Sequence, residues 1–549
     1  MKPQLQVISS NHVFLSAEKP DVPATLVIKD GRIAAILPRE AIAQFAQQAS
    51  QPESDTPVVY DALDNFICPG FHDSHQHVFH AALFPSKLAC EYAGTSEQDC
   101  VEHMVAFAQT SPQTGWLVSH GWREALWTPR IVPTKASLDK AFPDRPVAMY
   151  SGDAHTLWVN SCGLRELGIT NDTQPPAGGS FDRDESGELT GVIREAAGMK
   201  YVARILSSFA TNELKEIYTS YFAKLNAMGV TSVCDMALSL IAGADGINPE
   251  VYEALEADDK LNVRVHMFPT LTDDLSNLET LQARCQTPLL RAPGFKQFFD
   301  GVSSQHTAWC SEPYRNPRCP HDVGRPTIAP ERMHELVLKA AKAGHGVRIH
   351  TIGDEAVAQA LSIFEEAHKR YGAPKQGCFT MEHIEDIDPA NIARFAAAGV
   401  VASMQPPHIT IDITQAARDL GEKRAARMWP FDQMEQQGVT MAFGTDAPVV
   451  PPTSMDVLYT ACARKTPTTH EPDGGWYPEH ALGRVAAIKA YSYGSACAVG
   501  RSHELGTLQE GQYADLVVWD TNLVSCKDDQ LQQAHAKMTA VQGRIVFEA

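Results

Sequence analysis

Three histidines and an aspartate lie within ten residues of the sequence, in the stretch CPGFHDSHQH at 68–77. His75 and His77 are two positions apart, so both side chains point to the same side of an extended segment. Imidazole nitrogens bind zinc, nickel, iron and manganese, and this pair is therefore typical of half of a metal site. The alternative interpretation is a loop that carries unrelated polar residues.

Further side chains of suitable chemistry lie in or at the ends of apolar runs: Lys296, His350, His383 and Asp446. Each alone has an ordinary explanation, because the chain has 21 histidines, a lysine extends readily to the surface, and the stretch GTDAP fits a turn. Together they indicate one site, since the carboxyl ends of parallel strands meet at one face of an α/β barrel.

Eight short runs rich in β-branched or aromatic residues are predicted as strands, at residues 65–71, 229–236, 261–271, 294–301, 346–353, 378–385, 399–408 and 438–448. Segments between them, such as 331–344 and 389–399, have a helical period and end at glycine. The predicted fold class is therefore α/β, with a (β/α)8 TIM barrel at its centre.

Two regions depart from this alternation of strands and helices. The gap between the first two strands is about 160 residues, far more than one crossover needs, so residues 85–215 are predicted to be an insertion subdomain after the first barrel strand. Both ends of the chain contain strand signals, at 25–37, 511–520 and 540–549. We predict a small composite β-sandwich from residues 1–64 and 500–549, beside a barrel formed by residues 65–499.

The overall charge limits the possible partners. The 549-residue chain has a net charge of −20 at pH 7, which opposes binding to nucleic acid or to anionic lipid. The first residues lack the apolar core of a secretion signal, and there is no run of 18 apolar residues. We expect a cytoplasmic protein with a small-molecule substrate and no membrane span, and a homodimer is the common default for such proteins.

Motifs along nearly the whole chain carry a resemblance to a known family, among them FHDSHQH (71–77), IHTIGDEAV (349–357), MEHIEDIDP (381–389) and GTDAPVVPP (444–452). Their order resembles the amidohydrolase superfamily, and within it the family-3 branch that includes enzymes like N-substituted formamide deformylase. The resemblance implies a centre of one or two divalent ions, with zinc favoured. The implied ligands are His75, His77 and Asp446 on the more buried ion, His350 and His383 on the second, and Lys296 as a carboxylated bridge.

The resemblance also implies roles in catalysis. Asp446 would bind metal and carry the proton from the attacking water to the leaving nitrogen. His155, in a motif with Asp153, would orient the substrate carbonyl, although a purely structural pair explains this motif equally well. Trp122 and Trp158 are candidates for the pocket wall, with core packing as the alternative. The substrate pocket is harder to assign, because Val302 and Gln305 stand where relatives often have smaller or basic residues.

The expected function is that of a metal-dependent hydrolase, an amidohydrolase that cleaves a non-peptide C–N bond, such as an amide or formamide, with a metal-activated hydroxide. Two alternatives remain open from the sequence. The same centre could act on an ester, a lactone or a cyclic imine, because the nucleophile is indifferent to the carbonyl it attacks. A catalytically silent regulatory or binding protein could also retain this fold.

Overall fold

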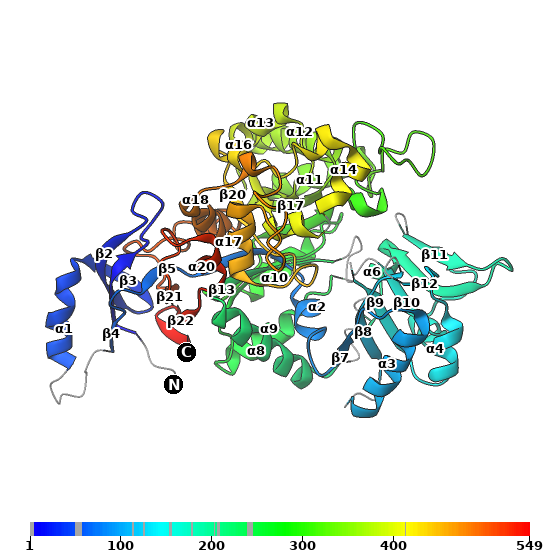
Figure 1. Ribbon diagram of the computed structural model, residues 1–549, viewed down its shortest axis with the longest axis horizontal. Coiled ribbons are helices and arrows are strands. Elements are labelled where there is room, and N and C mark those ends of the chain that lie inside the picture. Colours follow the sequence, from blue (N-terminus) through cyan, green and yellow to red (C-terminus); the bar gives the residue numbers. More distant parts are fainter. Residues whose placement is uncertain are drawn as a thin grey trace.

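Eight parallel strands form the centre of the protein, and most of them lead into a helix (Figure 1). The computed structural model describes residues 5–49, 58–111, 115–124, 127–152, 156–176, 179–201, 204–205, 209–238, 245–411 and 413–549. The central strands are β6 (Phe71–Gln76), β13 (Val230–Met236), β14 (Arg264–Phe268), β16 (Gly294–Phe298), β17 (His345–Thr351), β18 (Gln376–His383), β19 (Val401–Met404) and β20 (Met441–Phe443). Seven of the eight lie within or overlap the runs predicted from the sequence. The first, β6, shares only Phe71 with its predicted run.

These strands belong to two sheets, β15-β14-β13-β6, in which β15 is the short strand Leu290–Arg291, and β16-β17-β18-β19-β20. Isolated parallel bridges link the sheets on both sides, between Gln76 and Ala447 and between Thr270 and Lys296. The strand order, completed by these bridges, is that of a (β/α)8 barrel. Among the described residues, the hydrogen-bonded strand pairs do not run continuously around all eight strands. A fully closed barrel therefore stays a prediction, which the two bridges favour.

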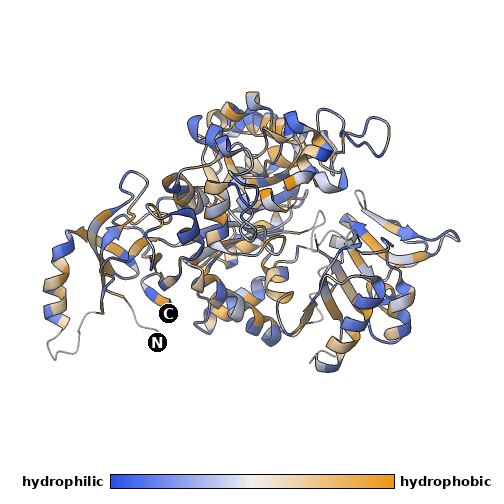
Figure 2. Ribbon diagram, viewed as in Figure 1, coloured by the Kyte–Doolittle hydropathy of each residue, from blue (hydrophilic) through white to orange (hydrophobic). Residues whose placement is uncertain are grey.

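Helices cover the outside of the central strands, and most lie between consecutive strands. They are α8 (Thr211–Ala227), α9 (Pro249–Ala257), α10 (Ser276–Arg284), α11 (Pro330–Ala343), α12 (Asp354–Tyr371), α13 (Ile392–Ala398), α14 (Ile413–Leu420), α16 (Phe431–Gln436) and α17 (Ser454–Ala463). Helix α11 shows why the sequence forms a helix here: it starts at a proline, buries residues three or four apart, and ends at Gly344 with φ +89°. Hydrophobic and hydrophilic segments alternate along such helices (Figure 2), as expected where one face packs on the sheet.

Strands from both ends of the chain share one sheet, in the order β23-β22-β21-β5-β1-β2-β3, with β4 on β1. Its N-terminal strands are β1 (Val7–Val13), β2 (Val22–Lys29), β3 (Arg32–Leu37), β4 (Val59–Asp61) and β5 (Phe66–Pro69), and its C-terminal strands are β21 (Leu516–Trp519), β22 (Ala536–Val541) and β23 (Arg544–Glu548). Strand β5 lies between β1 and β21. The N-terminal and C-terminal segments therefore form one sheet together. The exact limits of the domain that they build stay a prediction.

The prediction of a single first strand over 65–71 was wrong. The stretch contains two strands, β5 in the terminal sheet and β6 in the barrel sheet, separated by Gly70. A side chain at position 70 would place its Cβ 2.2 Å from the Thr231 hydroxyl oxygen. Only glycine lets the chain pass so close to β13 while it leaves one sheet and enters the other.

The segment between β6 and β13 builds a separate sheet of six strands, in the order β11-β12-β10-β9-β8-β7 (Figure 1). Its strands are β7 (Ala89–Glu91), β8 (Leu117–Trp122), β9 (Val147–Ser151), β10 (Thr156–Val159), β11 (Gly179–Arg183) and β12 (Leu189–Glu195), with helices α3 (Glu97–Thr110), α4 (Lys135–Ala141) and α5 (Ser161–Leu167) beside them. We refer to this segment as the insertion. Among the described residues, no helix is long and apolar enough to cross a membrane.

Candidate metal centre

The ends of four barrel strands bring predicted ligands into one buried cluster. The Oδ1 atom of Asp446 lies 3.4 Å from Nε2 of His75 and 3.2 Å from Nε2 of His77. Ligand atoms of His75, His383 and Asp446 all lie within 4.8 Å of one another, and the His350 ring is centred 4.5 Å from that of His383. All five side chains are buried, although Asp446 and His75 are 371 positions apart.

In three of these histidines, a hydrogen bond on the ring nitrogen away from the cluster fixes the tautomer. In each ring Nδ1 faces an oxygen that can only accept a hydrogen bond, so Nδ1 carries the proton and Nε2 keeps a lone pair for the centre. The three pairs are His75 with the Glu382 carboxylate (2.7 Å), His77 with the Met236 carbonyl (3.0 Å) and His383 with the Gln405 side-chain oxygen (2.8 Å). Such outer partners are typical of metal-binding histidines.

Lys296 lies among these groups as a buried amine without a partner. Its side chain is fully buried, and its Nζ has no hydrogen-bond partner among the described residues. Burial lowers the pKa of Lys296 to about 8, because a charged ammonium is costly away from water. The orphaned amine, next to imidazoles with free lone pairs and a carboxylate, is a donor set that fits a divalent metal far better than a packed core.

The cluster is electrostatically matched to a cation. Burial lowers the pKa of His75 to about 4, so its ring is neutral at pH 7. Burial alone would raise the pKa of Asp446, but the histidine side chains that face it hold it well below its usual range. Neutral imidazoles and an ionised carboxylate are the protonation states that metal binding requires.

The cluster forms the floor of a cavity of about 1140 Å³ between the barrel and the insertion. Trp122 lines this cavity, as do Val302 and Gln305, and it also packs in the core of the insertion. Trp158 has the alternative role, core packing: it is fully buried in the core of the insertion, where its indole N–H donates to the Thr134 carbonyl. Asp153 and His155 lie outside the described residues.

Comparison with known proteins agrees with this arrangement. The model of the amidohydrolase family matches residues 58–547, which span the central strands and every side chain of the cluster. The chain belongs to the amidohydrolase family. This amidohydrolase is 24% identical over 566 residues to N-substituted formamide deformylase from Arthrobacter pascens, with 99% of this chain and 98% of that protein covered.

Solved structures show the same fold. A metal-dependent hydrolase from Pyrococcus horikoshii OT3 matches this amidohydrolase with a TM-score of 0.75 at 22% identity, covering 95% of this chain and 99% of that one. The zinc complex of atrazine chlorohydrolase TrzN from Arthrobacter aurescens TC1 matches with a TM-score of 0.52 at 15% identity, covering 99% and 95%. Membership of this family makes the protein a hydrolase, and the solved structures show its fold.

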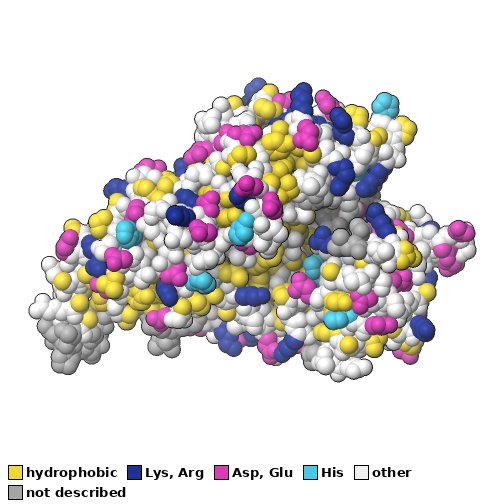
Figure 3. All heavy atoms as spheres, in the orientation of Figure 1, with side chains coloured by type: hydrophobic (Ala, Val, Ile, Leu, Met, Phe, Trp, Pro, Cys, Tyr) yellow, Lys and Arg dark blue, Asp and Glu magenta, His cyan; other side chains and the backbone are white. Residues whose placement is uncertain are grey.

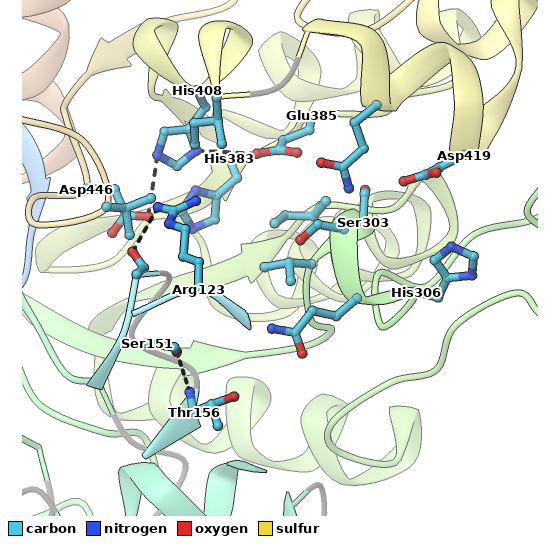
Figure 4. A pocket seen from close by; sticks show the side chains of 18 of the residues that line it. Arg123, Ser151, Thr156, Ser303, His306, His383, Glu385, His408, Asp419 and Asp446 are labelled. Carbon is cyan, nitrogen blue, oxygen red and sulfur yellow. Dashed lines mark hydrogen bonds and ion pairs between the residues drawn. The ribbon is translucent and has the colours of Figure 1, made fainter. Parts of the chain in front are cut away.

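The amidohydrolase site also contains His408, to which sequence reasoning assigned no role. His408 follows β19, and its Nε2 lies 3.7 Å from Oδ2 of Asp446, while its Nδ1 lies 3.3 Å from Oε1 of Glu385 (Figure 4). Burial would lower the pKa of His408, but the carboxylates of Glu385 and Asp446 raise it above its usual value. The signal for this residue was its position at the end of the predicted strand 399–408, in QPPH at 405–408.

Proposed function

We propose that this amidohydrolase cleaves the C–N bond of a small non-peptide amide or formamide. The observation that carries the proposal is a cluster at the floor of a cavity. It consists of imidazoles, Asp446 and the Lys296 amine, which has no hydrogen-bond partner among the described residues. A divalent ion bound there lowers the pKa of a water molecule and polarises the scissile carbonyl. The similarity to a formamide deformylase supports the choice of bond.

Asp446 is the group placed to move the proton. It lies at the cavity floor, and its pKa is held well below the usual range, so it can accept a proton only from a strongly acidified water. It then delivers that proton to the leaving nitrogen, which would otherwise depart as a very unstable amide anion. His408, hydrogen-bonded to Glu385, lies on the other oxygen of Asp446 and holds the carboxylate in place.

We propose zinc as the metal and a carbamate on Lys296 as a ligand. Imidazole and carboxylate donors suit zinc, and a zinc complex is known for a fold neighbour. An ammonium has no lone pair for a metal, whereas a carbamate offers anionic oxygens. A pKa of about 8 leaves a useful fraction of Lys296 as the neutral amine that carbon dioxide requires.

The test combines metal analysis, a variant and a substrate panel. Purified protein should contain one or two zinc ions per chain, and Asp446→Asn should lower kcat by at least about 100-fold, because it removes a positioned acid–base group. Asp473→Asn, at a fully exposed aspartate, is the matched control and should change kcat by less than about twofold, as surface substitutions generally have little effect.

The panel contains amides, formamides and the corresponding esters and lactones. Turnover confined to the amides supports the proposal, and turnover confined to the esters shows that the same centre serves C–O bonds instead. A protein that is free of metal as purified, or an Asp446→Asn variant with unchanged turnover, refutes it. Absence of turnover with any substrate, despite full metal loading, points to a silent binding protein.

A further inference from the structure

Arginine side chains gather around the mouth of the cavity, in a protein whose net charge is −20. Five of them line it: Arg123, Arg130, Arg194, Arg318 and Arg418. Figure 3 shows Lys and Arg side chains around the hollow between the insertion and the helices over the barrel. The local charge is therefore opposite in sign to that of the whole chain.

Three of these arginines are neutralised by nearby carboxylates. The pairs are Arg130 with Glu124 (3.6 Å), Arg194 with Asp182 (2.7 Å) and Arg418 with Asp419 (3.1 Å). The remaining acidic groups that line the cavity, Glu385 and Asp446, face His408 and the metal cluster. Among the described residues of the cavity wall, no carboxylate is therefore left over for the other two arginines.

Arg123 and Arg318 bond only to main-chain carbonyls among the described residues. Arg123 donates to the Gly152 carbonyl (3.3 Å), and Arg318 donates to the carbonyls of Gln305 (2.8 Å) and Ser304 (3.1 Å). A carbonyl orients a guanidinium but does not cancel its charge. Both cations therefore keep their full charge on the cavity wall.

The position of Arg123 is fixed by its neighbour. A Cβ atom on Gly152 would lie 2.2 Å from Nε of Arg123, so glycine is needed for the arginine to lie where it does. Figure 4 shows the Arg123 side chain pointing from the insertion toward the side of the cavity that holds His383, His408 and Asp446. The guanidinium therefore lies on the part of the cavity wall that the insertion forms.

We propose that the substrate carries an anionic group, a carboxylate or a phosphate-type group, that Arg123 binds while the scissile amide lies at the metal cluster. Arg318 adds positive potential from the barrel side. A planar guanidinium binds such oxyanions with two parallel hydrogen bonds. The inference rests on the proposed function for the position of the amide, but the anion site itself depends only on the cavity wall.

The experiment uses three matched formamides, 4-(formamidomethyl)benzoate, its carboxamide and the corresponding phenylphosphonate. Binding is measured by calorimetry on the metal-free full-length protein, because metals also attract anions, and kcat/KM is measured on the zinc-loaded protein. The anionic members should bind more tightly than the carboxamide. Arg123→Gln should reduce the preference for the anion by at least about tenfold, the typical value of a hydrogen bond to a charged group.

Three variants distinguish anion binding by Arg123 from a general attraction of anions to the positive charge at the cavity mouth. Arg130→Gln removes one positive charge from the same mouth and should change the preference by less than about threefold, since exposed ion pairs contribute little. Arg123→Lys should restore part of the preference, and Gly152→Ala should reduce it although the charge remains. The carboxylate and phosphonate arms tell which anion fits better.

Equal binding of the anionic and neutral compounds, no measurable binding of either anion, or equal effects of Arg123→Gln and Arg130→Gln would overturn the inference. These results are independent of turnover. Zinc-loaded protein that binds the anions through Arg123 but cleaves none of the formamides counts against the proposed function alone.

Discussion

Replacement of Glu382 tests most directly whether outer partners orient the histidines of the metal cluster. The buried Glu382 carboxylate accepts from Nδ1 of His75 at 2.7 Å and lies 3.2 Å from Nε of Arg348. Glu382→Gln keeps the shape but removes the negative charge that both partners face. His75 then loses the acceptor that fixes its tautomer, and the guanidinium of Arg348 loses its counterion.

The structure indicates how much stability and how much metal affinity the Glu382→Gln variant should lose. Burial alone would raise the pKa of Glu382, but Arg348 and His75 lower it from its usual value of 4.5 to about 2. A shift of this size corresponds to about 3 kcal/mol of stability, in line with the about 3–5 kcal/mol lost when one partner of a buried ion pair is removed. Loss of such an outer partner of a metal-binding histidine typically lowers metal affinity by roughly 10- to 100-fold.

Two assays separate these effects. Urea unfolding of the metal-free proteins should show Glu382→Gln less stable by about 3 kcal/mol at pH 7. Because the folded-state pKa is depressed, this difference is fully present above about pH 4.5 and shrinks as the pH falls toward 2. Zinc affinity is then measured by competition with a chelator. Gln286→Glu, at an exposed position, is the control, because it exchanges the same two side chains in the reverse direction.

The reasoning is refuted by either of two results. One is a zinc affinity within about twofold of the wild type, well below the expected loss. The other is a stability difference that stays below about 0.5 kcal/mol, the range of an ordinary surface substitution.

Two further predictions concern buried charges. Lys296→Met should abolish turnover and lower the zinc content, yet stabilise the metal-free protein by about 3 kcal/mol at pH 7, because the pKa of about 8 in the folded protein lies below the usual value of 10.5. The gain should vanish as the pH rises to about 10.5, and a destabilised metal-free variant would contradict it. Asp515→Asn should cost about 3 kcal/mol in urea unfolding, because it leaves the fully buried Arg264, now bonded at 2.5 and 2.9 Å, without its carboxylate. Zinc content should stay unchanged in that variant, since Arg264 begins its strand and the metal cluster lies at the opposite strand ends; loss of zinc would show that the two ends are coupled.

The sequence was sufficient to predict most of the central strands and the order of the ligand residues. Apolar runs bounded by glycine or proline identified the seven central strands that follow β6, and the rule that carboxyl ends converge joined His75 to Asp446 across the chain. The split at Gly70 was missed, because β5 and β6 are both fully buried and the apolar run continues across the glycine.

The outer partners of the histidines could not be predicted. Strands buried on both faces do not alternate polar and apolar residues, so the sequence does not tell which side chains point inward. The role of Glu382 depends on the register that sets it beside His350 on the neighbouring strand and turns it toward His75. Arg123 depends in addition on how the insertion lies over the barrel, which no local pattern encodes.

The position of β5 has a consequence for synthesis of the chain. One edge of this strand is completed by β21, and the Trp519 indole that packs on Cys68 lies 451 residues further along. At the usual speed of translation, roughly 20–90 seconds pass between the appearance of the two strands. During that time β5 is an open edge with unpaired main-chain groups, a template for pairing with other nascent chains. The yield of folded protein should therefore depend on how well this one strand is protected until its last neighbour is made.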